Sequence, residues 1–210
     1  MRFKKIYVEI TNSCNFNCSF CFPSIRKKKF ITTTEFREVV QKIRPFTDFI
    51  YLHVLGEPLL HPHLDELLTI AEDAGLFVNI TTNGVLIEQK KEILRKHHIR
   101  QLNISIHDIE ENIQKDKIDD YLNEILTFAQ EIAAETYVCL RFWNQKTNEQ
   151  NPFNDICLKK IKEKLDISEN LHVDKTKGNG IKLANHIFLQ NADRFEWPDL
   201  NKNKFNELKT

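Results

Sequence analysis

The sequence predicts an α/β fold built as a partial (β/α)6 barrel, and two observations support this prediction. Segments rich in β-branched and aromatic residues alternate with segments whose apolar residues recur at helical spacing along most of the 210 residues. Parallel strands joined by helices bury both faces of their sheet, and successive right-handed units curl into a barrel. A flat doubly wound sheet is the alternative, because a single sequence does not reveal the strand order.

Six segments have the composition of strands in such a sheet. Each is short, rich in β-branched or aromatic residues, and followed by turn-forming or polar residues. The predicted strands are residues 6–11, 49–54, 77–81, 101–106, 137–142 and 186–189.

Helices are predicted between these strands. Residues 32–35, Thr-Thr-Thr-Glu, have the form of a capping box, and the apolar residues of 36–43 follow it at helical spacing. Residues 64–71 and 122–129 repeat that spacing. Gly75 stands where a glycine ends a helix. These stripes are expected to face the core.

The domain organisation is expected to be a single core at residues 1–191 followed by a polar tail at 192–210. Within the core, residues 12–31 separate the first strand from the capped helix. Connections of this kind usually have about two to six residues, and much longer ones are usually functional.

The composition excludes several classes of partner. Thirty basic residues balance thirty acidic ones, so neither nucleic acid nor an anionic membrane surface is expected to bind through a global charge. The amino terminus lacks the apolar stretch of a signal peptide, and no run approaches the roughly 18 apolar residues of a membrane span. We expect a cytoplasmic protein.

The long loop holds the residues best suited to bind a metal. Cys14, Cys18 and Cys21 present three thiols at spacings that let them converge on one centre, and the odd total of five cysteines argues against a disulfide framework. Two alternatives remain open: one buried helical face, or a zinc site with three cysteines and one histidine. The candidate fourth zinc ligands are His53, His61, His63 and His107.

The pattern Cys-x3-Cys-x2-Cys after a first strand, with Phe20 directly before the third cysteine, resembles the signature of the radical S-adenosylmethionine (SAM) superfamily. The resemblance implies a partial TIM-like barrel as the core. It also implies that Cys14, Cys18 and Cys21 hold a 4Fe-4S cluster whose open iron binds the amino and carboxylate groups of SAM. Phe20 is expected to lie beside these cofactors and shield them from solvent.

Later strand ends carry further candidate SAM contacts. Gly56, Glu57 and Pro58 resemble the Gly-Glu-Pro motif of the family, which binds the SAM amino group, although such a turn also occurs as a purely structural connection. Asn83 lies in a segment common at the third strand and is equally consistent with a simple turn. The resemblance places Ser105 near the SAM ribose and carboxylate.

Arg141 on the fifth predicted strand points inward or outward by simple alternation, and an inward guanidinium suits the SAM carboxylate. His107 departs from the commonest family pattern, which has an acidic residue two positions after the serine. It therefore either faces substrate or serves the structure. Apart from the zinc alternative, no role is assigned from sequence to His53, and none to Asn144.

The activity implied by the resemblance is reductive cleavage of SAM to a 5′-deoxyadenosyl radical, which abstracts hydrogen from a substrate. The expected electron donor is a protein such as flavodoxin or ferredoxin. The expected substrate is a peptide or protein, because the chain most resembles family members that carry a C-terminal SPASM domain; RNA or a small metabolite is the alternative.

No cysteine follows Cys157, so we expect one cluster and no SPASM domain with its auxiliary clusters. Two alternatives to an active enzyme follow from that expectation. One is a truncated relative that binds cluster and SAM with impaired catalysis, and the other is a non-enzymatic zinc-binding module.

Overall fold

The computed structural model describes residues 2–22, 25–145, 151–168 and 180–193 of the chain. These residues contain a seven-stranded sheet with the strand order β1-β2-β3-β4-β5-β7-β6. All neighbouring strands are parallel except β6 and β7, which are antiparallel. The strands are β1 (Ile6–Tyr7), β2 (Phe49–Tyr51), β3 (Phe77–Thr82), β4 (Ile99–Ser105), β5 (Tyr137–Gln145), β6 (Ile181–Ala184) and β7 (Ile187–Asp193).

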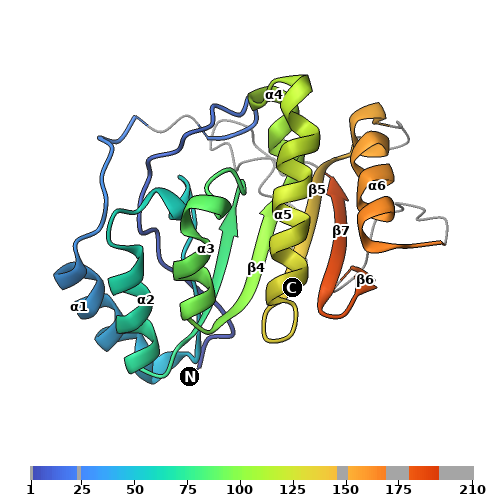
Figure 1. The fold of residues 1–210 in the computed structure, drawn as a ribbon. Helices are drawn as coiled ribbons and strands as arrows, with labels where there is room; N and C mark the ends of the chain where they lie inside the picture. The colour runs from blue at the N-terminus through green and yellow to red at the C-terminus, as the bar shows by residue number, and fades with distance from the viewer. Residues whose placement is uncertain (1, 23–24, 146–150, 169–179, 194–210) are drawn as a thin grey trace, which may run out of the picture.

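The α-helices lie on one face of this sheet (Figure 1). They are α1 (Thr33–Ile43), α2 (Leu64–Asp73), α3 (Ile87–Lys96), α4 (Ile109–Asn112), α5 (Ile118–Ile132) and α6 (Pro152–Leu165). The parallel strands follow chain order from β1 to β5 and then to β7. A doubly wound sheet reverses its strand order at a switch point and carries helices on both faces. The predicted α/β fold of the partial-barrel type is therefore confirmed, with the sheet left open between β1 and β6.

The core lies between the sheet and the helices. Side chains that point from the strands toward the helices, such as those of Ile50, Ile80 and Leu140, are fully buried. They pack against helix residues of the predicted apolar stripes, including Phe36 and Leu122. Alternate strand residues occupy the opposite, helix-free face, because successive side chains of a strand point to opposite sides.

The predicted start of the first helix is confirmed in detail. Thr32 accepts a hydrogen bond from the backbone N–H of Glu35, and the Glu35 carboxylate accepts one from the Thr32 N–H, which completes the capping box before α1. Gly75 follows the end of α2 with a positive φ of 68°, as a glycine beyond a helix C-terminus should.

Three strand predictions need correction. The second strand was predicted at residues 49–54, but β2 ends at Tyr51. The first strand was predicted to continue to residue 11, but β1 ends at Tyr7, and Thr11 makes only an isolated bridge with Phe30. The chain leaves the sheet there because Ile10 and Asn12 pair with the far end of the long loop instead.

The last predicted strand, 186–189, is β7 at Ile187–Asp193, and a further strand, β6, precedes it. The two form a hairpin with Asn185 and His186 in the turn, where His186 has a φ of 50°. Apart from its first two residues, the predicted tail at 192–210 lies outside the described residues.

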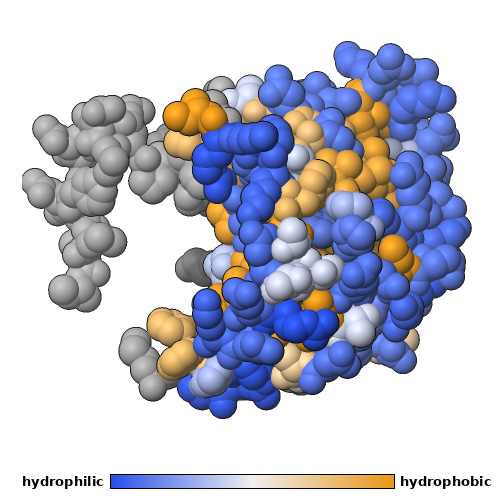
Figure 2. All heavy atoms as spheres, turned by 90° about the vertical axis from the view of Figure 1, so that its left-hand side faces the viewer, coloured by the Kyte–Doolittle hydropathy of each residue, from blue (hydrophilic) through white to orange (hydrophobic). Residues whose placement is uncertain are grey.

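In the described part of the chain, every helix is too short or too polar to pass through a bilayer. The face in Figure 2 carries mostly hydrophilic side chains with smaller hydrophobic areas between them.

Gly84, which follows β3, should tolerate no side chain. It has a φ of 82°, and an added Cβ would lie 2.7 Å from the Tyr121 hydroxyl and 3.1 Å from Cγ2 of Ile104. We expect Gly84→Ala to lower the free energy of unfolding by about 3 kcal/mol, from left-handed backbone strain plus overpacking. Gly75→Ala should cost only about 1 kcal/mol, because it adds the strain without the clash. Urea denaturation of both variants measures the difference, and equal losses would contradict the packing argument.

Candidate functional site

Hydrogen bonds join the two ends of the long loop and form its neck. The side chain of Asn12 donates to the Lys27 carbonyl (3.0 Å) and accepts from the Lys29 amide (2.8 Å). The Thr11 hydroxyl donates to the Lys29 carbonyl (2.9 Å). Asn12 and Thr11 are both buried, so these bonds are shielded from competing water. The neck holds the three cysteines above the carboxyl ends of the strands.

Gly56 brings the loop after β2 into contact with the cysteine loop. It has a φ of 78°, and a Cβ there would meet the Thr11 carbonyl oxygen at 2.5 Å and the Ser13 carbonyl oxygen at 2.8 Å. The next residue, Glu57, donates its backbone N–H to the Ser13 carbonyl (2.8 Å). Only a glycine permits this approach, so Gly56 has a structural reason to stand here as well as any role toward a ligand.

Glu57 is buried, with 2% of its surface exposed. Its Oε1 accepts hydrogen bonds from the Leu59 amide (2.9 Å) and the Thr82 hydroxyl (2.7 Å), and its Oε2 accepts one from the Asn83 amide (2.8 Å). Burial raises the pKa of Glu57 to about 7, although the three hydrogen bonds act in the opposite direction. Pro58 begins a single 3₁₀ turn, Pro58–Leu60, that carries the Leu59 amide. The carboxylate thus joins the turn after β2 to the end of β3.

Asn83 extends this connection to the first cysteine. Its Nδ2 donates to Oδ1 of Asn15 (2.8 Å) and lies 3.9 Å from Sγ of Cys14. Its backbone carbonyl accepts a hydrogen bond from the buried Tyr121 hydroxyl (2.7 Å). Asn83, the residue directly after β3, therefore contacts the cysteine loop.

The three thiols lie at the surface of this assembly. Cys14 and Cys21 are exposed and Cys18 is half-buried. Burial, and next the charge of Asp108, raise the pKa of Cys18 to about 12. Burial also raises the pKa of Cys14 and of Cys21. A thiol must lose its proton to bind iron, so metal binding at this loop releases protons.

The end of β4 reaches the cysteine loop through aromatic contacts. Ser105 is buried there, and the His107 ring lies 5.6 Å from the Phe20 ring. Nδ1 of His107 lies 3.1 Å from the Arg141 carbonyl oxygen and 3.2 Å from the Trp143 amide nitrogen, and Nε2 lies 2.9 Å from Asp108 Oδ1. His107 is thus engaged by β5 and by its own turn, which supports the structural alternative for this residue.

Arg141 points to the helix-free face of the sheet. Its Nε donates to Oε1 of Gln190 (3.2 Å), its Nη1 lies 3.5 Å from the Thr81 hydroxyl, and its guanidinium lies 4.5 Å from the centre of the Trp143 ring. His53 lies on the same face, with Nε2 3.2 Å from the Thr81 hydroxyl. Burial, and next the charge of Arg141, lower the pKa of His53 to about 4, so its ring is neutral.

Two groups of candidates are explained by packing. Asn144 and Asn154 exchange a pair of side-chain hydrogen bonds of 2.9 Å each, which join β5 to α6. Cys139 and Cys157 are buried free thiols; Cys157 packs in the hydrophobic core, whereas Cys139 lies beside Arg141. Neither group contacts the cysteine loop through the bonds described here.

The family model of the Radical SAM superfamily matches residues 8–137 of the chain. The chain belongs to the radical SAM superfamily. A probable GTP 3′,8-cyclase of Pyrobaculum aerophilum is 27% identical over 107 residues, which are 50% of this chain and 34% of that protein. A PqqA peptide cyclase of Bradyrhizobium diazoefficiens is 28% identical over 123 residues, 56% of this chain and 32% of that protein.

Two solved structures share the fold. SuiB of Streptococcus suis bound to S-adenosylmethionine has a TM-score of 0.54 at 17% identity over 74% of this chain and 38% of that one. BtrN in complex with AdoMet and 2-DOIA has a TM-score of 0.53 at 21% identity over 67% of this chain and 58% of that one. This chain spans about a third of the length of the curated relatives it matches.

The cofactors of the superfamily are a 4Fe-4S cluster and SAM, and the donor set of the cysteine loop suits that cluster. The three thiols stand on one loop, within eight consecutive residues of the chain. Within residues 2–22, 25–145, 151–168 and 180–193, no three His, Cys, Asp or Glu side chains are close enough to hold a metal ion.

Two residues beside the three loop cysteines were not predicted from the sequence. Asn112 donates to Sγ of Cys18 (3.4 Å), and Glu111 accepts hydrogen bonds from Ser19. Both belong to α4, more than 90 residues away in the chain. A polar pair in a four-residue helix carries no local signal of such a contact. Asn12 could have been suspected, because it lies between a strand and the cysteines.

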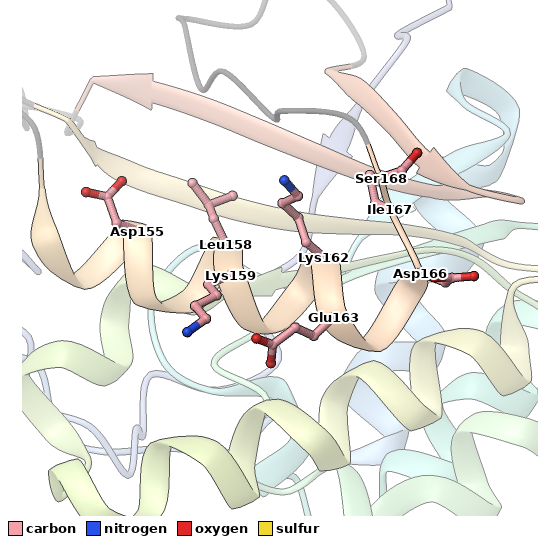
Figure 3. Close-up of a pocket in the computed structure, with 8 residues that line it drawn as sticks. All are labelled: Asp155, Leu158, Lys159, Lys162, Glu163, Asp166, Ile167 and Ser168. Carbon is pink, nitrogen blue, oxygen red and sulfur yellow. The ribbon is translucent and has the colours of Figure 1, made fainter.

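A separate hollow of about 470 Å³ runs along α6. Figure 3 shows that its lining side chains, among them Leu158, Lys162 and Ser168, come from α6 and the residues after it. None of the predicted cluster or SAM residues lines this hollow.

The buried carboxyl of Glu57 should make the stability of the metal-free protein depend on pH. The folded chain keeps this proton up to a pKa of about 7, whereas the unfolded chain releases it near the ordinary value of 4.5. The free energy of unfolding should therefore fall between these pH values, by about 3 kcal/mol from this group. Urea denaturation from pH 4 to pH 8 measures the slope.

Glu57→Gln should remove this part of the slope while lowering stability overall, because its amide cannot accept from the Asn83 amide at Oε2. Glu38→Gln, at an exposed site on α1, serves as the control and should keep the slope of the unmodified protein. An unchanged slope in Glu57→Gln would show that the carboxyl is ionised throughout this range.

Proposed function

We propose that this chain is a radical SAM enzyme in which Cys14, Cys18 and Cys21 hold the 4Fe-4S cluster. The cluster, when bound, supplies the electron that cleaves SAM to a 5′-deoxyadenosyl radical. The observation that carries the proposal is the placement of the three thiols on a loop with a closed neck. That loop is tied to the ends of β3 and β4 by Asn83 and Asn112.

The protein's own groups would bind and orient SAM. We propose that Gly56, Glu57, Pro58, Asn83 and Ser105 surround the SAM amino group and ribose at the strand ends. Phe20 and Arg141 complete the proposed site. Arg141 contributes a cation on the helix-free face, where bidentate guanidinium contacts suit the SAM carboxylate. Glu57 holds Thr82 and Asn83 in place, so it shapes this site even where it does not touch SAM.

The proposed substrate is a peptide or protein. A PqqA peptide cyclase is among the relatives, and a similar fold occurs in SuiB bound to the precursor peptide SuiA. GTP 3′,8-cyclases are also relatives, so a nucleotide is the second candidate. The proposed electron donor is a protein such as flavodoxin or ferredoxin, and the proposed compartment is the cytoplasm, where five free thiols remain reduced.

Anaerobic reconstitution with iron and sulfide tests the cluster assignment. The chain should take up about four irons, and reduction with dithionite in the presence of SAM should release 5′-deoxyadenosine. Cys14→Ala, Cys18→Ala and Cys21→Ala should each lose the cluster, because each removes one of its thiolate ligands. Iron and sulfide analysis and chromatography of the nucleoside measure both steps.

Cys139→Ala and Cys157→Ala are the matched controls, because both cysteines are buried away from the loop. Both should retain the iron, and Cys157→Ala should also retain the nucleoside release; Cys139→Ala is a control for the iron alone, because Cys139 contacts Arg141. Stoichiometric zinc without sulfide in the unmodified protein would refute the proposal and favour a zinc module.

Arg141→Ala should weaken SAM binding to the reconstituted protein by about one to two decades, the worth of a hydrogen-bonded charge pair. The SAM affinity of Arg141→Lys should lie between those of the unmodified protein and Arg141→Ala, since lysine keeps the charge without the bidentate geometry. Arg100→Ala is the control, because Arg100 lies on the same face over the Phe49 ring at the other end of the strands. Isothermal titration with SAM measures the affinities, and equal losses in Arg141→Ala and Arg100→Ala would remove Arg141 from the site.

A further inference from the structure

Two neighbouring side chains of helix α4 form hydrogen bonds with the middle of the cysteine loop. Glu111 accepts two hydrogen bonds from Ser19, one from its amide and one from its hydroxyl, at 2.7 Å each. Oδ1 of Asn112 accepts the amide of Asn17 at 2.8 Å. Nδ2 of Asn112 lies 3.4 Å from Sγ of Cys18. The two side chains thus contact three consecutive residues of the loop.

These contacts restrict the conformation of the cysteine loop. The Asn112 side chain is itself anchored, because its Nδ2 also donates to the Asp108 carbonyl (2.8 Å) one turn earlier. The Glu111 carboxylate uses both oxygens on one residue, which fixes the direction of the Ser19 backbone as well as its position. Since α4 follows the end of β4 after a single 3₁₀ turn, Ile106–Asp108, these contacts fix the position of the loop relative to the sheet as well as to its own neck.

We propose that Glu111 and Asn112 are positioning residues for the cluster loop. Glu111 and the Asn112 oxygen set the backbone at Asn17 and Ser19, and the Asn112 N–H group directs the sulfur of Cys18. The part of this inference that concerns the Cys18 sulfur rests on the proposed role of Cys18 as a cluster ligand. The part that concerns the backbone at Asn17 and Ser19 does not depend on a cluster.

The N–H group beside Cys18 has a further consequence in the loaded protein. Hydrogen bonds to the sulfurs of a cluster are one of the levers that set its reduction potential. An N–H donor stabilises the more negative, reduced state, so it raises the potential. Asn112 therefore tunes the ease with which the cluster accepts an electron, while Glu111 acts on the backbone.

Hydrogen exchange of the Asn17 and Ser19 amides in the metal-free protein tests the backbone part, measured by NMR. Glu111→Ala should speed exchange at Ser19, and Asn112→Ala should speed it at Asn17, each by roughly fivefold for the loss of one ordinary hydrogen bond. Asn112→Asp keeps the acceptor and should preserve the protection at Asn17. Glu110→Ala, at an exposed site on the same helix, should change neither amide. Unchanged exchange in both alanine variants would overturn the proposal.

The reduction potential of the reconstituted protein tests the sulfur contact, by titration followed with electron paramagnetic resonance. Asn112→Ala should shift the potential to more negative values because it removes the donor without changing the charge. Glu110→Ala removes a negative charge from the same helix, so any general field effect would move the potential in the opposite direction. An unshifted potential in Asn112→Ala would overturn the sulfur contact. Failure of the unmodified chain to bind a cluster would refute the proposed function, while the exchange rates still decide the backbone part.

Discussion

The candidate site depends on one buried carboxylate. Glu57 accepts three hydrogen bonds at 2% exposure, and these bonds unite the turn after β2 with the end of β3. A buried carboxylate that lost its donors would be costly, so the segments that supply them are held together. Because Gly56 packs against the Ser13 carbonyl, the position of Glu57 also determines where the cysteine loop can lie.

Amide side chains that follow two of the strands also hold the cysteine loop in place. Asn83 after β3 reaches Asn15 near the first cysteine, and Asn112 after β4 reaches Cys18. Amides suit this task because they donate and accept at once and carry no charge that would oppose a negatively charged cluster. The parallel, chain-ordered sheet places both of these strand ends at the same edge, which is why one loop can meet them together.

The helix-free face of the sheet differs chemically from the face beneath the helices. Its fully buried Asn79 and Asn103 donate to the carbonyls of Ile50 and Ile80. Above them Arg141 provides a cation. The ring of His53 stays neutral beside that cation. Such a face offers fixed dipoles and a localised positive charge, which are the means by which an enzyme orients a polar cofactor without supplying the chemistry itself.

The features that the sequence by itself determined are local ones. The capping box at Thr32, the glycine after α2, the alternation of strands and helices and the cysteine spacing all act within a few residues, so propensity and periodicity reveal them. Only the tertiary structure decided which way Arg141 points, where Asn112 reaches and that β6 pairs with β7. These features depend on contacts between segments that are distant along the chain, or on how a short strand pairs. They follow from packing and register, which no single segment encodes.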